Sequence, residues 1–334
     1  VGARDADRYL ADITAMLGMA EHVLDEPFLI SRLVGMSIAE MAFTAVADTA
    51  TAEGLLSDAQ LRDLAHRLGA FADGRIRVAG SGETLVVEDL LQRFFSDDGS
   101  GDGRFIGVSD VDRLYETWGV ARPKAEPLLK AIRPVQATFV ASRAEIRERA
   151  DYFAAMVAVD DALPPWRHHE RASARAYQQL RDTGIFTVLP LIESLMDGDE
   201  GGSTQAACGT RDLVETQRDM ALTVLAMEAY RRATGGWPRT LADLVPKYLP
   251  SLPRDPFDGE PLRYLLAEDP GASPRLYSVG VDQVDGGGVA PDRERQALRV
   301  NSFYWFGVKK KLDEAGASIE ASDIPAGDWV LWPR

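Results

Sequence analysis

The sequence has little of several features that commonly define a function. Its 334 residues include one cysteine, Cys208, which excludes an intramolecular disulfide and any metal cluster built on cysteines. Basic residues are in the minority, with 37 Lys and Arg against 52 Asp and Glu, and the longest basic run is the three lysines at 309–311. Because the resulting net charge of -15 repels phosphate backbones, we expect no nucleic acid among the partners.

Long hydrophobic runs are also scarce. A run without charges, such as residues 183–192, is well short of the roughly 18–20 residues that a membrane-spanning helix needs. We therefore expect no membrane-spanning segment in this chain. The chain begins at Val1 rather than at a methionine, so an anchor or an export signal upstream is compatible with it.

A catalytic signature is missing as well. The four histidines, at 22, 66, 168 and 169, all fall in predicted helices, and neither a Gly-x-Ser-x-Gly elbow nor a glycine-rich phosphate loop accompanies them. This favours a non-enzymatic protein. The alternative is an acid/base or metal-assisted hydrolase with its site in the helical part, for which a pocket lined by carboxylates of raised pKa would be the sign.

Helical periodicity dominates the first two thirds of the chain. Ser57 and Gln60 form a capping-box pattern before one of the helices, and Pro134 interrupts the longest helical stretch. The polar segment 197–205 contains almost no apolar residue and predicts a linker. We therefore expect a helical bundle domain over 1–196 and a second domain over 206–334. Helices are predicted over 5–24, 28–46, 57–68, 85–95, 125–162, 166–182 and 187–196.

An Asp/Gly-rich loop at 97–105 partly matches a calcium-binding loop. Asp98, Ser100 and Asp102 occupy the first, third and fifth ligand positions, and Gly103 takes the position of the sharp turn. Ser109 stands where such loops carry a bidentate Glu. Two interpretations remain open: a turn between two helices, or a weak calcium site.

The last third of the chain carries an ordered series of motifs. A helix over 212–234 ends at Gly235, a short helix covers 241–245, and strands over 261–266 and 275–279 follow a tight turn at Asp258-Gly259. This predicts a long helix packed on a small antiparallel sheet. The motifs are Tyr230-Arg-Arg-Ala-Thr-Gly-Gly-Trp-Pro238, Leu241-Ala-Asp-Leu244, Asp255-Pro-Phe-Asp-Gly259, Tyr277-Ser-Val-Gly-Val-Asp282 and Asp323-Ile-Pro-Ala-Gly-Asp-Trp329.

In this order the motifs resemble the globular part of the major pseudopilin of type II secretion systems, the type II secretion protein G family. The resemblance implies a mainly α protein that ends in a small α+β domain, and one Ca²⁺ ion that ties a polar loop to the sheet. Its ligands would be Ser278, Asp282 and Asp323, with Asp285 as a substitute.

The chain departs from that family in three places. Gln283 follows Asp282 where the family has Gly, about 40 residues separate Asp282 from Asp323, and a helical region of about 205 residues replaces the polymerising N-terminal helix. Assembly into a pilus is therefore not carried over. We expect an extracytoplasmic structural or interaction protein that binds a protein partner or self-associates, with the helical region and the aromatic segment 303–306 as contact surfaces.

Overall fold

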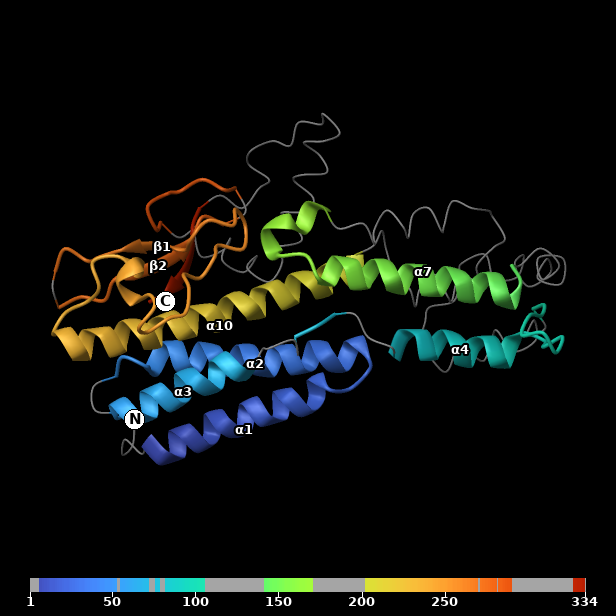
Figure 1. Ribbon diagram of the computed structural model, residues 1–334, viewed down its shortest axis with the longest axis horizontal. Helices are drawn as coiled ribbons and strands as arrows, with labels where there is room; N and C mark the ends of the chain where they lie inside the picture. The colour runs from blue at the N-terminus through green and yellow to red at the C-terminus, as the bar shows by residue number, and fades with distance from the viewer. Residues whose placement is uncertain are drawn as a thin grey trace, which may run out of the picture.

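The structure is a computed structural model in which a mainly helical protein ends in a three-stranded antiparallel sheet (Figure 1). It describes residues 6–52, 55–71, 76–78, 82–105, 141–170, 202–269, 271–280, 282–289 and 327–333. The fold class predicted from the sequence is confirmed. The helices are α1 (Ala6–Leu24), α2 (Leu29–Thr49), α3 (Asp58–Phe71), α4 (Gly82–Phe94), α7 (Arg143–Asp161), η1 (Pro165–Glu170), α10 (Gly202–Thr234) and η2 (Leu241–Leu244), and the strands are β1 (Arg263–Leu265), β2 (Arg275–Ser278) and β3 (Trp329–Trp332).

The long helix α10 is the centre of the molecule. It packs against α2 and α3 on one side and against η2 and β3 on another, so that it separates the bundle of α1, α2 and α3 from the sheet (Figure 1). Because both sides are covered, its apolar residues run around the helix, as expected for a helix buried inside a protein. Met220, Val224, Leu225 and Met227 are fully buried.

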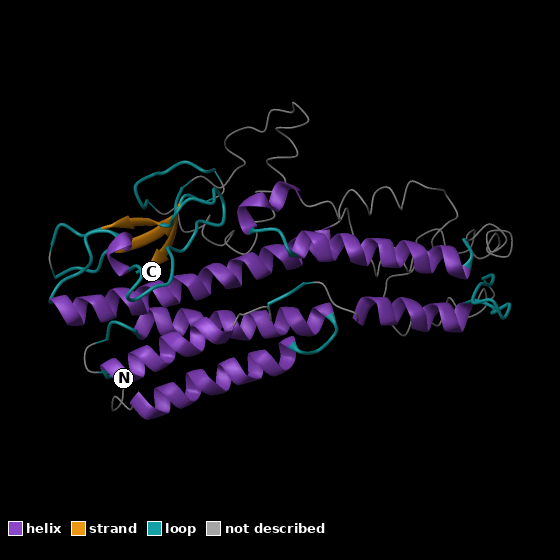
Figure 2. Ribbon diagram, viewed as in Figure 1, coloured by secondary structure: helices purple, strands orange, loops and turns teal. Residues whose placement is uncertain are grey.

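The sheet has the order β1-β2-β3, and both pairs are antiparallel. Tyr277 of β2 pairs with Arg263 of β1 and Val330 of β3, so β2 is the central strand. Phe257 and Trp329 meet edge to face with ring centroids 6.4 Å apart. The helices and the sheet of this C-terminal part are separated by colour in Figure 2.

One hydrophobic core connects the N-terminal bundle to the C-terminal sheet. Buried side chains such as Phe43 of α2, Leu225 of α10 and Leu331 of β3 belong to the same cluster. The predicted domain boundary at 197–205 stays a prediction, but α10 already begins at Gly202, inside that range. A helix that buries two faces in one core joins the two parts tightly.

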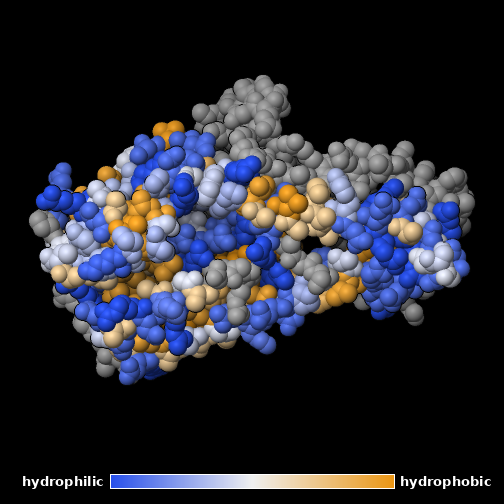
Figure 3. Space-filling model, in the orientation of Figure 1, coloured by the Kyte–Doolittle hydropathy of each residue, from blue (hydrophilic) through white to orange (hydrophobic). Residues whose placement is uncertain are grey.

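The pair α4 and α7 extends from one end of this core. Its buried residues Leu91, Phe94 and Ile146 are not part of the main cluster, which α7 joins through Val157. Arg147 of α7 contacts both carboxylate oxygens of Glu88 on α4, with 2.8 Å between Nη2 and Oε2. On the face shown in Figure 3, hydrophilic residues cover most of the end of this pair.

Several local predictions can be compared with the structure. Ser57 and Gln60 make the capping box, with Ser57 N donating to Oε1 at 2.9 Å and Gln60 N to Oγ at 3.3 Å. Two predicted helices have a different form: η1 and η2 are short 3₁₀ helices. Pro246 limits how far η2 can extend, whereas η1 begins at Pro165 and only residues 166–170 of the helix predicted at 166–182 are described. The predictions for 106–140, 171–201 and 290–326 lie outside the described residues.

Among the described helices, α2 is the one that is long and apolar enough to cross a membrane by length and composition. Core helices of other proteins share that property. Ala39, Phe43 and Val46 are buried, whereas Ile30 and Met41 are exposed. The described residues therefore give no clear membrane span, in agreement with the sequence.

Candidate functional site

Asp328, directly before β3, ties the loop after β2 to the sheet. Its carboxylate is fully buried and accepts hydrogen bonds from the backbone N–H of Gly286, Gly288 and Val289 at 3.1, 2.6 and 3.1 Å. Asp328 N donates to the carbonyl of Val289 in return, at 3.0 Å. Three N–H donors compensate a buried carboxylate without a cation, because bonds to a charged acceptor are strong.

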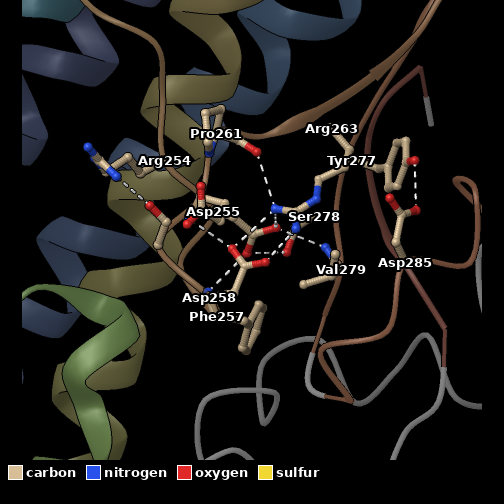
Figure 4. A network of polar contacts seen from close by, with 12 residues as sticks. Arg254, Asp255, Phe257, Asp258, Pro261, Arg263, Tyr277, Ser278, Val279 and Asp285 are labelled. Carbon is tan, nitrogen blue, oxygen red and sulfur yellow. Dashed lines mark hydrogen bonds and ion pairs between the residues drawn. The ribbon is translucent and has the colours of Figure 1, made fainter.

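Asp255 has the same role for the turn before β1 (Figure 4). It is fully buried and accepts from the backbone N–H of Phe257 and Val279 at 3.0 and 2.9 Å, and from Ser278 Oγ at 2.9 Å. Burial raises the pKa of Asp255, and these hydrogen bonds oppose the rise. Arg263 Nη1 lies 3.3 Å from Oδ2 of Asp255. The 255–259 motif is thereby attached to the end of β2.

The predicted calcium ligands have separate partners. Ser278 Oγ donates to Asp255, as described above, and accepts from Gly280 N at 3.1 Å. Asp285 is exposed and accepts from Gly287 N at 3.0 Å and Tyr277 Oη at 2.9 Å; these bonds, that of Gly287 first, lower the pKa of Asp285. Asp282 accepts from Val284 N at 3.2 Å and Gly327 N at 2.9 Å.

Whether these residues fit Ca²⁺ depends on Asp323, which lies outside the described residues. Within the described part of the chain, no group of three or more His, Cys, Asp or Glu side chains is arranged to hold a metal. Ca²⁺ takes about six to eight oxygen ligands, so Asp282 and Asp285 do not suffice alone. The bond from Gly327 N to Asp282 nevertheless brings the loop next to a residue only four positions after Asp323.

The second candidate loop folds back on its own backbone. Asp98 Oδ1 accepts from Ser100 N at 2.8 Å, Ser100 Oγ at 2.6 Å and Asp102 N at 3.3 Å. These bonds, led by that of the Ser100 hydroxyl, lower the pKa of Asp98. Short-range bonds of this kind are typical of Asx turns.

Asp102 connects this loop to the start of α7. Its Oδ1 accepts from Gly103 N at 2.7 Å and from Ala144 N, in the first turn of α7, at 2.9 Å. A side chain at Gly103 would have its Cβ only 1.8 Å from the carbonyl oxygen of Ser96, so glycine is required there. Asp98 and Ser100 bond to one another within the loop, Asp102 adds a contact to the first turn of α7, whose N-cap is Ser142, and both interpretations of the loop stay open.

A cleft lies between α10, the end of α7 and the segment before β1. Its volume is about 830 Å³, within the range of about 300–1,000 Å³ typical of small-molecule sites. Residues of α10 between 211 and 223 form one wall. The other wall contains Trp166, Arg254 and a group of prolines at 164, 165, 250, 253 and 256.

A buried arginine organises the α10 wall. The side chain of Arg211 is 4% exposed and forms ion pairs with Asp161 Oδ1 at 2.9 Å and Asp212 Oδ1 at 2.5 Å. It also donates to the carbonyl of Leu163 at 3.2 Å, and Asp161 accepts from Val78 N at 3.0 Å. Burial opposes the charge of Arg211, but Asp212 and Glu215 outweigh it and raise the pKa of the guanidinium.

Glu215 lies one helical turn after Arg211 and lines the cleft. Within the described residues, no Lys, Arg or His nitrogen forms an ion pair with its carboxylate at 4.0 Å or less. Burial raises the pKa of Glu215 to about 7, with Arg211 lowering it and Asp212 raising it to smaller extents. A carboxylic acid that titrates near neutral pH is suited to proton transfer or to a charge-dependent contact.

The opposite wall is held in place by the 255–259 motif. Arg254 lies over the ring of Trp166, 5.8 Å from its centroid, and donates to the carbonyl of Gly259 at 2.6 Å. Gly259 has φ 79°, and a Cβ there would approach the Trp166 ring to 2.9 Å. A larger residue at 259 would therefore collide with the Trp166 ring and would be strained at this φ.

Comparisons with known proteins give no match: no protein-family profile, curated protein or solved structure matches this chain.

Sequence reasoning missed the residues of the cleft and the two buried carboxylates of the sheet. Asp255 and Asp328 stand inside motifs that the sequence analysis singled out, but their burial depends on the folded loops. Arg211 and Glu215 are spaced four residues apart on a predicted helix. That spacing indicates a shared face, and it does not distinguish a solvated face from a buried one.

Proposed function

We propose that the chain is a non-enzymatic, extracytoplasmic structural or interaction protein built on a pseudopilin-like module. The observation that supports this is the arrangement around α10: a long helix is followed by η2, β1, β2 and β3, with η2 and β3 packed on that helix and β1 and β2 completing the sheet. It is the arrangement that the motif order implies. The bundle of α1, α2 and α3 covers the opposite side of α10 and would replace pilus contacts with contacts of another kind.

The proposal includes a calcium ion that links the loop after β2 to the chain before β3. Its support is the position of Asp282 beside Gly327, four residues after Asp323. Bound calcium would supply a positive charge on which Asp282 and Asp323 converge.

The location is tested with the complete gene product, fused at its C-terminus to a phosphatase that is active only outside the cytoplasm. We expect phosphatase activity from this fusion, and a matched fusion to a cytoplasmic protein is the control. Equal inactivity of both fusions, with the protein present at normal levels, would contradict an extracytoplasmic role.

A second candidate function is favoured by one observation. Glu215 titrates near neutral pH in a cleft that Asp161 and Asp219 also line, which is the arrangement expected for acid/base hydrolysis. Chromogenic esters and glycosides test it. Turnover with a pH limb near 7 that disappears in Glu215→Gln would establish the hydrolase. Absence of turnover across the panel would leave the interaction role as the better account.

A further inference from the structure

The carboxylates that line the cleft differ in how their charges are compensated. Asp161 pairs with Arg211, and Asp219 Oδ1 pairs with Arg218 Nη2 at 2.8 Å. Arg211 is also bound by Asp212. The cations of the α10 wall are thus already engaged by other carboxylates. Glu215 is left with no ion-pair partner in the described part of the chain.

The charged groups on the other walls do not supply the missing cation. Arg254 is directed to the Gly259 carbonyl and the face of Trp166, and Arg77, on the segment 76–78, is the remaining basic residue of the lining. Neither forms an ion pair with Glu215 within the described residues. The lining thus holds four arginines and three carboxylates, and Glu215 is the carboxylate among them that has no ion-pair partner in the described residues.

The wall opposite α10 suits the uncharged part of a cationic ligand. Trp166 and the prolines at 165 and 253 line the same cleft as Glu215 and contribute apolar surface to it. An alkyl chain could lie against this surface while its charged end reaches the carboxylate, since long cationic side chains bury their stems in this way.

We propose that the cleft binds the ammonium group of a ligand, with the charge on Glu215 and the aliphatic stem against Trp166 and the prolines of the lining. The shared chemistry is an alkylammonium ion, supplied either by a lysine side chain of a partner protein or by a free polyamine. This inference deepens the proposed interaction role by naming what the partner presents.

Such binding depends on pH, because only the ionised form of Glu215 attracts a cation. Arg211, Asp212, Arg218 and Asp219 also act on this carboxylate electrostatically. Glu215 has a pKa of about 7, so the ionised fraction rises from roughly one tenth at pH 6 to nine tenths at pH 8. The ammonium ion stays charged over this range, so affinity follows Glu215.

The experiment is isothermal titration calorimetry of the full chain with two cationic probes. One is a short peptide with a single lysine, and the other is spermidine; the matched neutral probe is the same peptide with norleucine in place of lysine. We expect a cationic probe to bind roughly tenfold more tightly at pH 8 than at pH 6. The norleucine peptide should show no such difference.

Two variants make the test specific. Glu215→Gln keeps the shape of the side chain and should remove both the binding and its pH dependence. Asp63→Asn makes the same change in net charge on α3, where the Asp63 side chain is 65% exposed, and should bind like the parent. Circular dichroism confirms that both variants are folded.

The outcomes are distinct. Binding of the lysine peptide alone identifies a protein partner, and binding of spermidine alone identifies a free polyamine; either supports the proposal. Equal binding to Glu215→Gln, or no binding of either probe to the parent, overturns it. The phosphatase fusion reports separately on the extracytoplasmic role, so failure of one does not imply failure of the other.

Discussion

The two halves of α10 handle buried acidic residues differently. In the C-terminal half, Glu228 has a side chain only 1% exposed, and it is paired with Arg231 at 2.8 Å and Arg232 at 2.7 Å. In the N-terminal half, Glu215 is partly buried at the cleft, and within the described residues no arginine reaches it. The first arrangement pairs the buried charge directly, whereas in the second Arg211 and Arg218 act on the carboxylate only at longer range and burial still raises its pKa.

Because of this difference we assign Glu228 a role in stability and propose a role in ligand binding for Glu215. Arg232 also donates to the Leu56 carbonyl at 2.7 Å, which links the end of α10 to the start of α3. Burying a charge is tolerated when hydrogen-bonded partners neutralise it. An uncompensated charge in a cleft instead shifts its pKa, as it does for Glu215.

The largest effect is expected from Arg211→Met, which removes the cation that Asp161 and Asp212 share. Both carboxylates are almost fully buried, with side chains 2% and 0% exposed. Removing their shared cation should lower the free energy of unfolding by about 3–5 kcal/mol. Urea denaturation measures the change.

The matched control for that variant is Arg93→Met. Arg93 pairs with Asp89 at 2.7 Å on the surface of α4, where both side chains are more than half exposed. A loss of no more than about 0.5 kcal/mol is expected there. If the two arginine variants lost equal stability, burial would not be the factor that separates them.

The same Glu→Gln substitution should change the stability of the protein in opposite directions in the two halves of α10. Glu215→Gln should stabilise the protein at pH 8, and Glu228→Gln should destabilise it, because the amide removes an uncompensated charge in one case and a compensated charge in the other. The shift of Glu215 from 4.5 to about 7 corresponds to at most about 3 kcal/mol.

The direction in which stability changes with pH follows from proton binding. Between pH 4.5 and about 7 the folded state holds a proton on Glu215 that the unfolded state has lost, so the stability of the parent falls as pH rises through this window. The gain in Glu215→Gln should therefore be absent near pH 4 and complete above pH 7. Thermal unfolding at several pH values measures it, and a gain independent of pH would contradict the explanation.

The negative charge of Asp328 is compensated in a third way, by backbone N–H donors. Asp328→Asn keeps the size of the side chain but weakens three charge-assisted bonds to the loop 286–289. We expect a loss of about 1–3 kcal/mol. Asp285→Asn, at an exposed carboxylate in the same loop, is the control, and a loss as large as that of Asp328→Asn would show that burial is not what matters.

The smallest expected effect concerns calcium. If Asp282 and Asp323 hold an ion, calcium at about ten times its dissociation constant should stabilise the protein by about 1.4 kcal/mol. Calorimetry with calcium and with excess chelator measures the shift in melting temperature, which Asp282→Asn should abolish. An unchanged melting temperature in the chelator would remove calcium from the proposed function.

Periodicity and turn chemistry predicted the elements of the fold well. The helices at 5–24 and 57–68, the stop at Gly235 and the two strands after Asp258-Gly259 all depend on local patterns that the folded protein keeps. The 3₁₀ form of η2 did not follow from periodicity, because a helix of four residues is too short to show a helical period.

The cleft could not be predicted from the sequence. Its walls come from α7, α10 and the segment 249–256, which lie far apart in the chain. The pKa of Glu215 depends on burial by those distant segments. For the calcium candidates, the motif located the right loop, but which carboxylates bind backbone N–H groups is decided by tertiary contacts such as that from Gly327 to Asp282.

The most direct test of the uncompensated charge on Glu215 is a titration of the side-chain carboxyl carbon by nuclear magnetic resonance, in protein labelled with ¹³C at glutamate. The signal is assigned by its loss in Glu215→Gln. The structure predicts a midpoint at about 7 in the free protein, and a lower midpoint when the lysine peptide is bound. A midpoint at the ordinary value of 4.5, unchanged by the peptide, would contradict it.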